Sequence, residues 1–98
     1  MFKPKALKRA LKVFSYRQLH GLLGLYEHKN EQLTYIQLSD VTGIYVSTFH
    51  GSAGVRVLEQ YGMAEIKRNP EVGKETLIKI TADGCKLVES LFREEAKL

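Results

Sequence analysis

Residues 34–62 read TYIQLSDVTGIYVSTFHGSAGVRVLEQYG, and this stretch decides the fold. It opens with a helix-start signal, because the hydroxyl of Thr34 can accept a hydrogen bond from an unpaired amide of the first turn. Gln37 follows three residues later and completes a T-x-x-Q capping box. Gly43 is expected to end this helix, since glycine readily adopts the left-handed conformation of a helix C-terminus. The expected buried face of the helix consists of Ile36, Leu38 and Val41.

A second helix is predicted to begin near Ser47 or Thr48 and to end at about Tyr61, where Gly62 stops it. The side expected to be buried carries Gly54, Val57, Leu58 and Tyr61. The opposite, exposed side carries Ser52, Val55, Arg56 and Glu59. Two helices joined by a short glycine-containing turn are typical of a helix-turn-helix, whose second helix lies in the DNA major groove. Residues 34–62 therefore predict a helix-turn-helix.

Two helices are expected before this unit. Residues 4–14, PKALKRALKVF, carry apolar residues at helical spacing among basic ones. Ser15 and Gln18 then form a second capping box, which favours a break and a new helix to about Lys29; one long helix through this point is the alternative. Gly21 and Gly24 allow the close approach of another helix, and that helix could belong to a second subunit. The buried stripe of the second helix is expected to contain Leu19, Leu22, Leu23 and Tyr26.

After Gly62 the apolar period changes from helical to alternating. Ala64 and Ile66 alternate with charged residues, and residues 76–81, TLIKIT, form a second strand with Ile78 and Ile80 facing inward. The polar turn between them makes a hairpin, or wing, over residues 63–81. Residues 32–33 could add a very short strand. Thr81 is expected to cap a last helix over residues 82–97, in which Cys85 has a plain packing role.

The charge is unevenly distributed along the chain. Of 15 lysine and arginine residues, six fall in the first 17 positions with no acidic residue among them, while the other 81 positions hold nine basic and eleven acidic residues. Residues 1–14 are therefore interpreted as a basic arm or helix that contacts phosphates, and a solvated, solubilising segment is the alternative. The composition, 44% apolar and 27% charged over 98 residues, favours one soluble domain.

Other function classes find little support in the residues. No apolar run is long enough for a membrane span and no secretory signal is evident, so a cytoplasmic protein without a membrane partner is expected. The three histidines, His20, His28 and His50, and the single Cys85 lack the spacing of metal ligands. No nucleotide-binding or nucleophile motif is present. We therefore expect no enzyme activity, no cofactor and no metal.

Three short motifs carry a resemblance to known regulators. They are Thr42-Gly43-Ile44, the run LEQYGM over residues 58–63, and ITADG over residues 80–84. With the order of elements, they resemble the MarR and PadR regulator class over about residues 15–95, and more closely the minimal winged-helix regulators of archaea and their viruses. The resemblance implies an α+β winged helix-turn-helix and a transcription regulator that binds double-stranded DNA. The chain is shorter than ligand-responsive MarR proteins, so a small-molecule effector stays open.

The predicted DNA-binding residues divide by role. Arg56 and the first turn of its helix are expected to contact bases, whereas the wing residues contact the backbone. The full set is Thr34, Tyr35, Tyr45, Ser47, Thr48, His50, Ser52, Arg56, Arg68 and Lys74. The alternative function is a winged helix that binds protein or RNA, for which Val55 is the one apolar hint on the recognition helix.

A homodimer built from the terminal helices is also expected, because two recognition helices match a palindromic site. The alternative is that the two apolar stripes pack against each other within one chain, giving a monomer of 11.1 kDa. The predicted dimer residues are Leu7, Leu11, Phe14, Leu87, Leu91 and Phe92.

Overall fold

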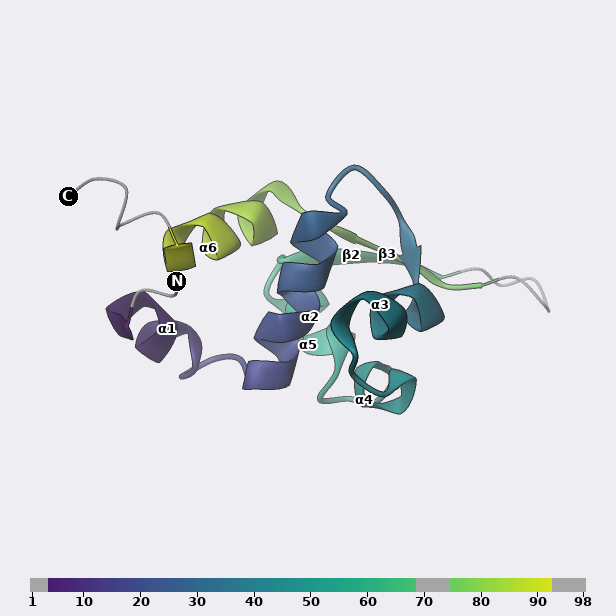
Figure 1. The fold of residues 1–98 in the computed structure, drawn as a ribbon, viewed down its shortest axis with the longest axis horizontal. Helices are drawn as coiled ribbons and strands as arrows, with labels where there is room; N and C mark the ends of the chain where they lie inside the picture. Colours follow the sequence, from purple (N-terminus) through teal and green to yellow (C-terminus); the bar gives the residue numbers. More distant parts are fainter. Residues whose placement is uncertain (1–3, 69–74, 93–98) are drawn as a thin grey trace.

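The computed structural model describes residues 4–68 and 75–92 (Figure 1). The elements in order are α1 (Pro4–Ala10), α2 (Tyr16–Glu27), β1 (Leu33–Thr34), α3 (Tyr35–Thr42), α4 (Val46–His50), α5 (Val55–Gln60), β2 (Ala64–Lys67), β3 (Leu77–Ile80) and α6 (Ala82–Phe92). Helix α2 runs through the middle, with α3 and α4 on one side and α1 and α6 toward the other end (Figure 1). The predicted α+β class is confirmed.

Both predicted capping boxes form. The Ser15 hydroxyl accepts the amide of Gln18 at 3.1 Å, and the Gln18 side-chain oxygen accepts the amide of Ser15 at 2.8 Å. Thr34 and Gln37 repeat the arrangement at 3.1 and 2.9 Å. The predicted break at Ser15 is therefore confirmed. Helix α1 ends at Ala10, earlier than predicted, and the chain reaches Ser15 through turns.

The sheet has three antiparallel strands in the order β1-β3-β2. The hairpin of β2 and β3 is the one that the alternating pattern predicted, and the short strand expected at residues 32–33 lies at Leu33–Thr34. Ile78 in the central strand pairs with Leu33 on one side and with Ile66 on the other. Ile78 and Ile80 face inward and are buried. The turn of the wing, including Lys74, lies outside the described residues.

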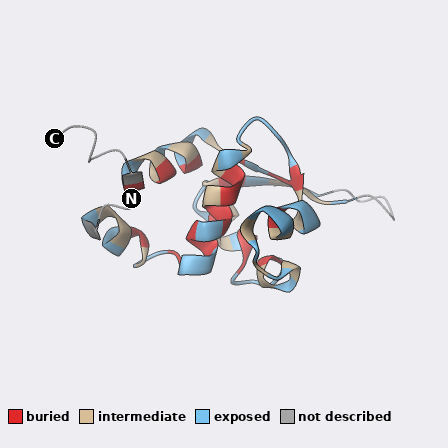
Figure 2. Ribbon diagram, viewed as in Figure 1, coloured by how far each residue is buried: buried red, intermediate tan, exposed pale blue. Residues whose placement is uncertain are grey.

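The core gathers around α2, where buried residues follow one side of the helix (Figure 2). Its two inner glycines let neighbouring helices approach closely. A methyl group on Gly21 would lie 2.9 Å from the Phe49 ring, and one on Gly24 would lie 2.7 Å from the Thr42 methyl. The predicted close approach is confirmed, but the approaching residues belong to α3 and α4 of the same chain rather than to a second subunit.

The terminal helices pack against each other within the chain. Ala10, Phe14 and Leu91 are 6%, 5% and 2% exposed and belong to the core. Phe14 and Leu91 were assigned to a dimer surface, but their burial within the chain leaves little of either side chain for a second subunit. Leu7, Leu11 and Leu87 are partly buried against the same core. The side chain of Phe92 and the predicted continuation of the helix through residue 97 lie outside the described residues.

The buried face of α3 is narrower than predicted. Leu38 is fully buried, but Ile36 is 63% exposed and Val41 is 42% exposed. The helix has eight residues and approaches α2 through Leu38 and Thr42, which are one turn apart. Ile36 lies about half a turn from Leu38 and therefore faces solvent.

Candidate nucleic-acid interface

The turn between α3 and α4 is fixed by local hydrogen bonds. Gly43 takes the left-handed conformation at φ 74°, which confirms the predicted C-cap. The Ser39 hydroxyl donates to the carbonyl of Ile44 at 2.5 Å, and the Thr42 hydroxyl accepts the amide of Ile44 at 3.3 Å. Both side chains of α3 thus hold the residue that leads into α4, so the direction of α4 is set by α3.

The predicted single recognition helix is wrong: α4 and α5 are separated by residues 51–54, GSAG. Two glycines and a serine in this stretch favour a break in the helix. The close packing of Gly54 against the backbone of α4 also requires the break. A methyl group on Gly54 would collide with the carbonyl oxygen of Phe49 and lie 2.8 Å from that of Thr48. The chain therefore folds back on α4 after the break. Residues 45–60, from the cap of α4 to the end of α5, are called the recognition segment below.

The break changes which residues of α5 are buried. Val55 was expected on the exposed side but is 1% exposed, and Tyr61 was expected in the core but is 56% exposed. Instead, the Tyr61 ring meets the edge of Phe14 with centroids 5.4 Å apart. Because Val55 is in the core, the apolar hint for a protein-binding recognition helix is removed.

Gln18 contributes a contact that the sequence did not predict. Its side chain is 9% exposed, and its amide nitrogen donates to the carbonyl of Ala53 between α4 and α5. The same side chain serves the capping box through its oxygen. Gln18 thus anchors the break in the recognition segment to the start of α2. The capping box could be predicted from the spacing of Ser15 and Gln18, but the bond to a partner 35 residues away could not.

The recognition segment presents several predicted contact residues to solvent. Tyr45 is 85% exposed, and Thr48 is half-buried. The Tyr35 ring stacks on His50 with centroids 4.1 Å apart and an interplanar angle of 26°, which joins the start of α3 to the end of α4. Thr34 uses its hydroxyl oxygen in the α3 cap. The predicted contact residues that are exposed in this segment are Tyr45, Ser47, His50, Ser52 and Arg56.

Arg68 is not a free cation at the wing. Two of its guanidinium nitrogens donate to the two carboxylate oxygens of Glu59, each at 2.9 Å. These hydrogen bonds lower the pKa of Glu59 and raise that of Arg68. The arginine predicted to contact DNA from the wing is thus bonded to a carboxylate on α5, and its DNA contact stays a prediction.

The charges of two arginines act on Tyr35. Burial raises the pKa of the Tyr35 phenol, and the positive charges of Arg68 and Arg56 oppose that rise. Arg56 also contributes to the lowered pKa of Glu59, after the larger effect of Arg68. Tyr35, Arg56, Glu59 and Arg68 thus form one neighbourhood, which connects α3, α5 and the end of β2.

The basic N-terminal segment lies apart from this neighbourhood. Helix α1 contacts α6, and it lies across α2 from α3 and α4 (Figure 1). The exposed cations of α1 are Lys5, Lys8 and Arg9, and Lys12 follows in the turn after it. The structure therefore separates the cations of α1 from the recognition segment, whereas Arg17 in α2 lines a small hollow together with Thr48.

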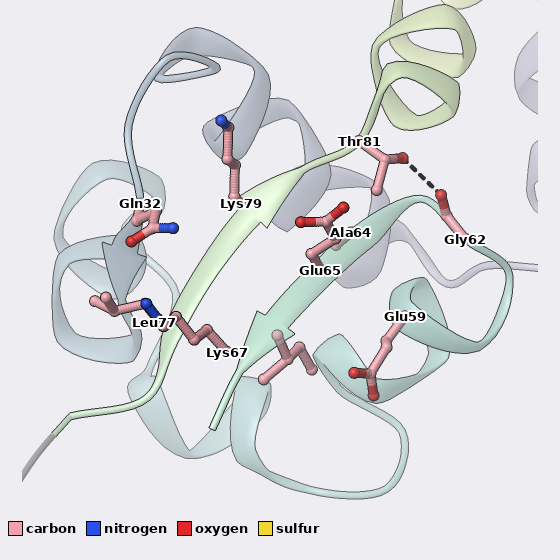
Figure 3. A pocket seen from close by; sticks show the side chains of 10 residues that line it. Gln32, Glu59, Gly62, Ala64, Glu65, Lys67, Leu77, Lys79 and Thr81 are labelled. Carbon is pink, nitrogen blue, oxygen red and sulfur yellow. Dashed lines mark hydrogen bonds between the residues drawn. The ribbon is translucent and has the colours of Figure 1, made fainter. Parts of the chain in front are cut away.

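A hollow on the outer face of the sheet has a volume of about 650 Å³ (Figure 3). Its lining mixes Glu65 with Lys67 and Lys79, and the Thr81 hydroxyl closes one end by donating to the Gly62 carbonyl at 2.6 Å (Figure 3). Among residues 4–68 and 75–92, no group of three or more potential metal ligands occurs. No helix in that part of the chain is long and apolar enough to cross a membrane.

No protein-family model matches the sequence, and no protein of curated function matches it significantly. Solved structures do match. A variant of MepR from Staphylococcus aureus, bound to an oligodeoxyribonucleotide, has a TM-score of 0.75 at 22% identity over 95% of this chain and 64% of that chain. The chain has the fold of winged-helix regulators.

Two further matches agree. MepR, described as a transcription regulator of the S. aureus multidrug efflux pump MepA, has a TM-score of 0.64 at 25% identity over 96% of this chain and 78% of that one. Rv1404 from Mycobacterium tuberculosis has a TM-score of 0.69 at 17% identity over 95% and 60%. These neighbours are MarR-type winged-helix proteins, so the predicted likeness to that class is confirmed. The chain spans less than two thirds of two of these three proteins. The likeness to archaeal and viral regulators stays a prediction.

Proposed function

We propose that the protein is a transcription regulator that binds double-stranded DNA sequence-specifically. The observation that carries the proposal is the recognition segment itself. Its polar side chains are exposed, while Phe49 and Val55 beneath them are buried and Gln18 anchors the loop between them. A surface fixed in this way can dock in a groove without first being ordered, which lowers the entropic cost of binding. Support also comes from the shared fold with MepR, a transcription regulator.

The chemistry of the recognition segment suits base edges. A guanidinium can donate two hydrogen bonds to guanine, and hydroxyl groups can donate to or accept from most bases. Arg56 supplies the guanidinium, and Ser47 and Ser52 supply the hydroxyl groups. Tyr45, at the cap of α4, is large and exposed enough to contact a sugar or a thymine methyl. The lysines of α1 and the wing add backbone contacts whose strength falls with salt.

The proposal includes a homodimer. A single recognition segment reads few base pairs, whereas a two-fold pair reads two half-sites about 34 Å apart. A groove of about 350 Å³ between α1 and α6 provides surface for a second copy. Its wall includes Ala6, Val13 and Leu87, of which Val13 is 46% exposed. These residues replace Phe14 and Leu91, which are buried within the chain, as the expected subunit contact.

The proposal is tested by selection from a pool of randomised duplexes, followed by a gel shift of the enriched duplex with excess competitor DNA. Retention of the enriched duplex and loss of a scrambled one support a sequence-specific regulator. Equal competition by both duplexes would refute sequence specificity. We place this activity in the cytoplasm, because a regulator of this kind acts on the chromosome or on a viral genome.

A further inference from the structure

The two arginines of the interface, Arg56 and Arg68, differ in their bonding. Arg68 at the end of β2 is held by two hydrogen bonds of 2.9 Å to Glu59. Within the described residues, the Arg56 side chain has no hydrogen bond or ion pair, and it is exposed. Glu59 follows Arg56 by three residues on α5, a spacing at which opposite charges on a helix attract each other. Glu59 is therefore bonded to Arg68, while Arg56 has the spacing for an alternative partner.

We propose that Arg68 is a positioning residue, which occupies Glu59 and thereby keeps Arg56 available to DNA. A carboxylate has two oxygens, and the fork of Arg68 uses both at once. This bidentate pair orients the carboxylate toward Arg68 and partly neutralises its charge, which weakens the attraction of Glu59 for Arg56. This inference rests on the proposed function, because it assigns a partner to Arg56 and revises the role of the wing arginine.

Two physical points favour this role over stabilisation of the fold or direct phosphate binding. The side chains of Arg68 and Glu59 are 54% and 33% exposed, and ion pairs with such exposure contribute little to stability. A direct phosphate contact by Arg68 would also bring the carboxylate that it binds, Glu59, close to the negative phosphate, which weakens that contact. The hydrogen bonds of Arg68 are the main cause of the lowered Glu59 pKa, and the positive charge of Arg56 adds to the lowering.

The first test measures DNA affinity on the selected duplex and on a scrambled duplex. Arg68→Gln releases Glu59, which then captures Arg56, so affinity for the selected duplex should fall about tenfold, as for loss of one good base contact. Adding Glu59→Gln to Arg68→Gln should restore the selected-to-scrambled ratio to within about twofold of wild type. Lys67→Gln is the matched control, because it removes the exposed cation next to Arg68 in the chain and should leave that ratio unchanged.

Direct phosphate binding by Arg68 predicts a different result. The double variant would then bind both duplexes weakly. The slope of log affinity against log salt would become less negative by about 0.9. That result would overturn the inference, and so would an unchanged selected-to-scrambled ratio in Arg68→Gln. Circular dichroism of each variant separates these outcomes from unfolding.

A second test needs no DNA and separates the inference from the proposed function. Carbon-13 NMR follows the titration of the Glu59 carboxylate in the free protein. In Arg68→Gln, the Glu59 pKa should remain lowered, and adding Arg56→Gln should raise it toward its ordinary value. No effect of Arg56→Gln in that background would overturn the capture of Arg56. If wild type shows no sequence preference, the proposed function fails, while this titration still decides whether Glu59 exchanges partners.

Discussion

The rings of Tyr35 and His50 stack with centroids 4.1 Å apart, so the first residue of α3 holds the last residue of α4. Aromatic pairs contribute about 0.5–1.5 kcal/mol beyond burial of their area. Tyr35→Ala should therefore lower the free energy of unfolding by an amount in that range or slightly above it, and should weaken DNA binding because α4 loses a support.

The control for this prediction is Tyr35→Phe, which keeps the ring and removes the hydroxyl. It should keep the stability and most of the DNA affinity. Chemical denaturation and fluorescence anisotropy on the selected duplex measure the two quantities. Equal losses for the alanine and phenylalanine variants would show that the hydroxyl, not the stack, is what matters.

The break in the recognition segment depends on one glycine. Gly54→Ala would place a methyl group against the backbone carbonyl groups of Phe49 and Thr48, which cannot move independently of α4. We expect a loss of about 2 kcal/mol or more in the free energy of unfolding, typical of overpacked buried sites. Gly51→Ala is the matched control, because nothing lies within 4 Å of a methyl group there. Similar denaturation midpoints for the two variants would contradict this packing.

The groove between α1 and α6 makes a separate prediction about the subunit contact. Val13→Glu adds a charge at a half-exposed groove residue and should convert the dimer to a monomer of 11.1 kDa without loss of helix content. Leu91→Glu should instead unfold the chain, because Leu91 is 2% exposed. Light scattering after size exclusion gives the masses. A monomeric wild type at tens of micromolar, or a dimeric Val13→Glu variant, would reject this surface.

The Glu59–Arg68 pair predicts a pH dependence with a definite sign. The pKa of Glu59 is lower in the folded protein than its ordinary value of 4.5, so the pair stabilises the protein above that pH and the contribution is lost as pH falls through the folded pKa. Thermal melts should show wild type slightly above Glu59→Gln at neutral pH, with the difference disappearing below 4.5. A difference that persists in acid would assign it to packing rather than charge.

The sequence predicted those parts of the fold that depend on local chemistry. The capping boxes at Ser15 and Thr34, the left-handed Gly43 and the alternating strand residues each rely on neighbours a few positions away, and each is confirmed. The break at Gly54 was missed, because the residues that exclude a side chain there come from the folded-back α4.

The candidate site was predictable only in part, for a related reason. The exposed residues of α4 follow from the helix-turn-helix pattern. The pairing of Arg68 with Glu59 and the anchoring of Ala53 by Gln18 join separate elements, and no spacing rule reveals them. The burial of Val55 likewise depends on the direction of α5, which differs from that of the single continuous helix predicted from the sequence.

The central claim is sequence-specific binding of duplex DNA through the recognition segment, and the salt dependence of binding by wild type and Arg56→Ala tests it most directly. For wild type on the selected duplex, log affinity should fall linearly with log salt at about 0.9 per phosphate neutralised. Arg56→Ala should lose about 1–3 kcal/mol on the selected duplex and little on a scrambled one, with a nearly unchanged slope. Affinity that does not vary with salt, or an equal loss on both duplexes, would contradict the account.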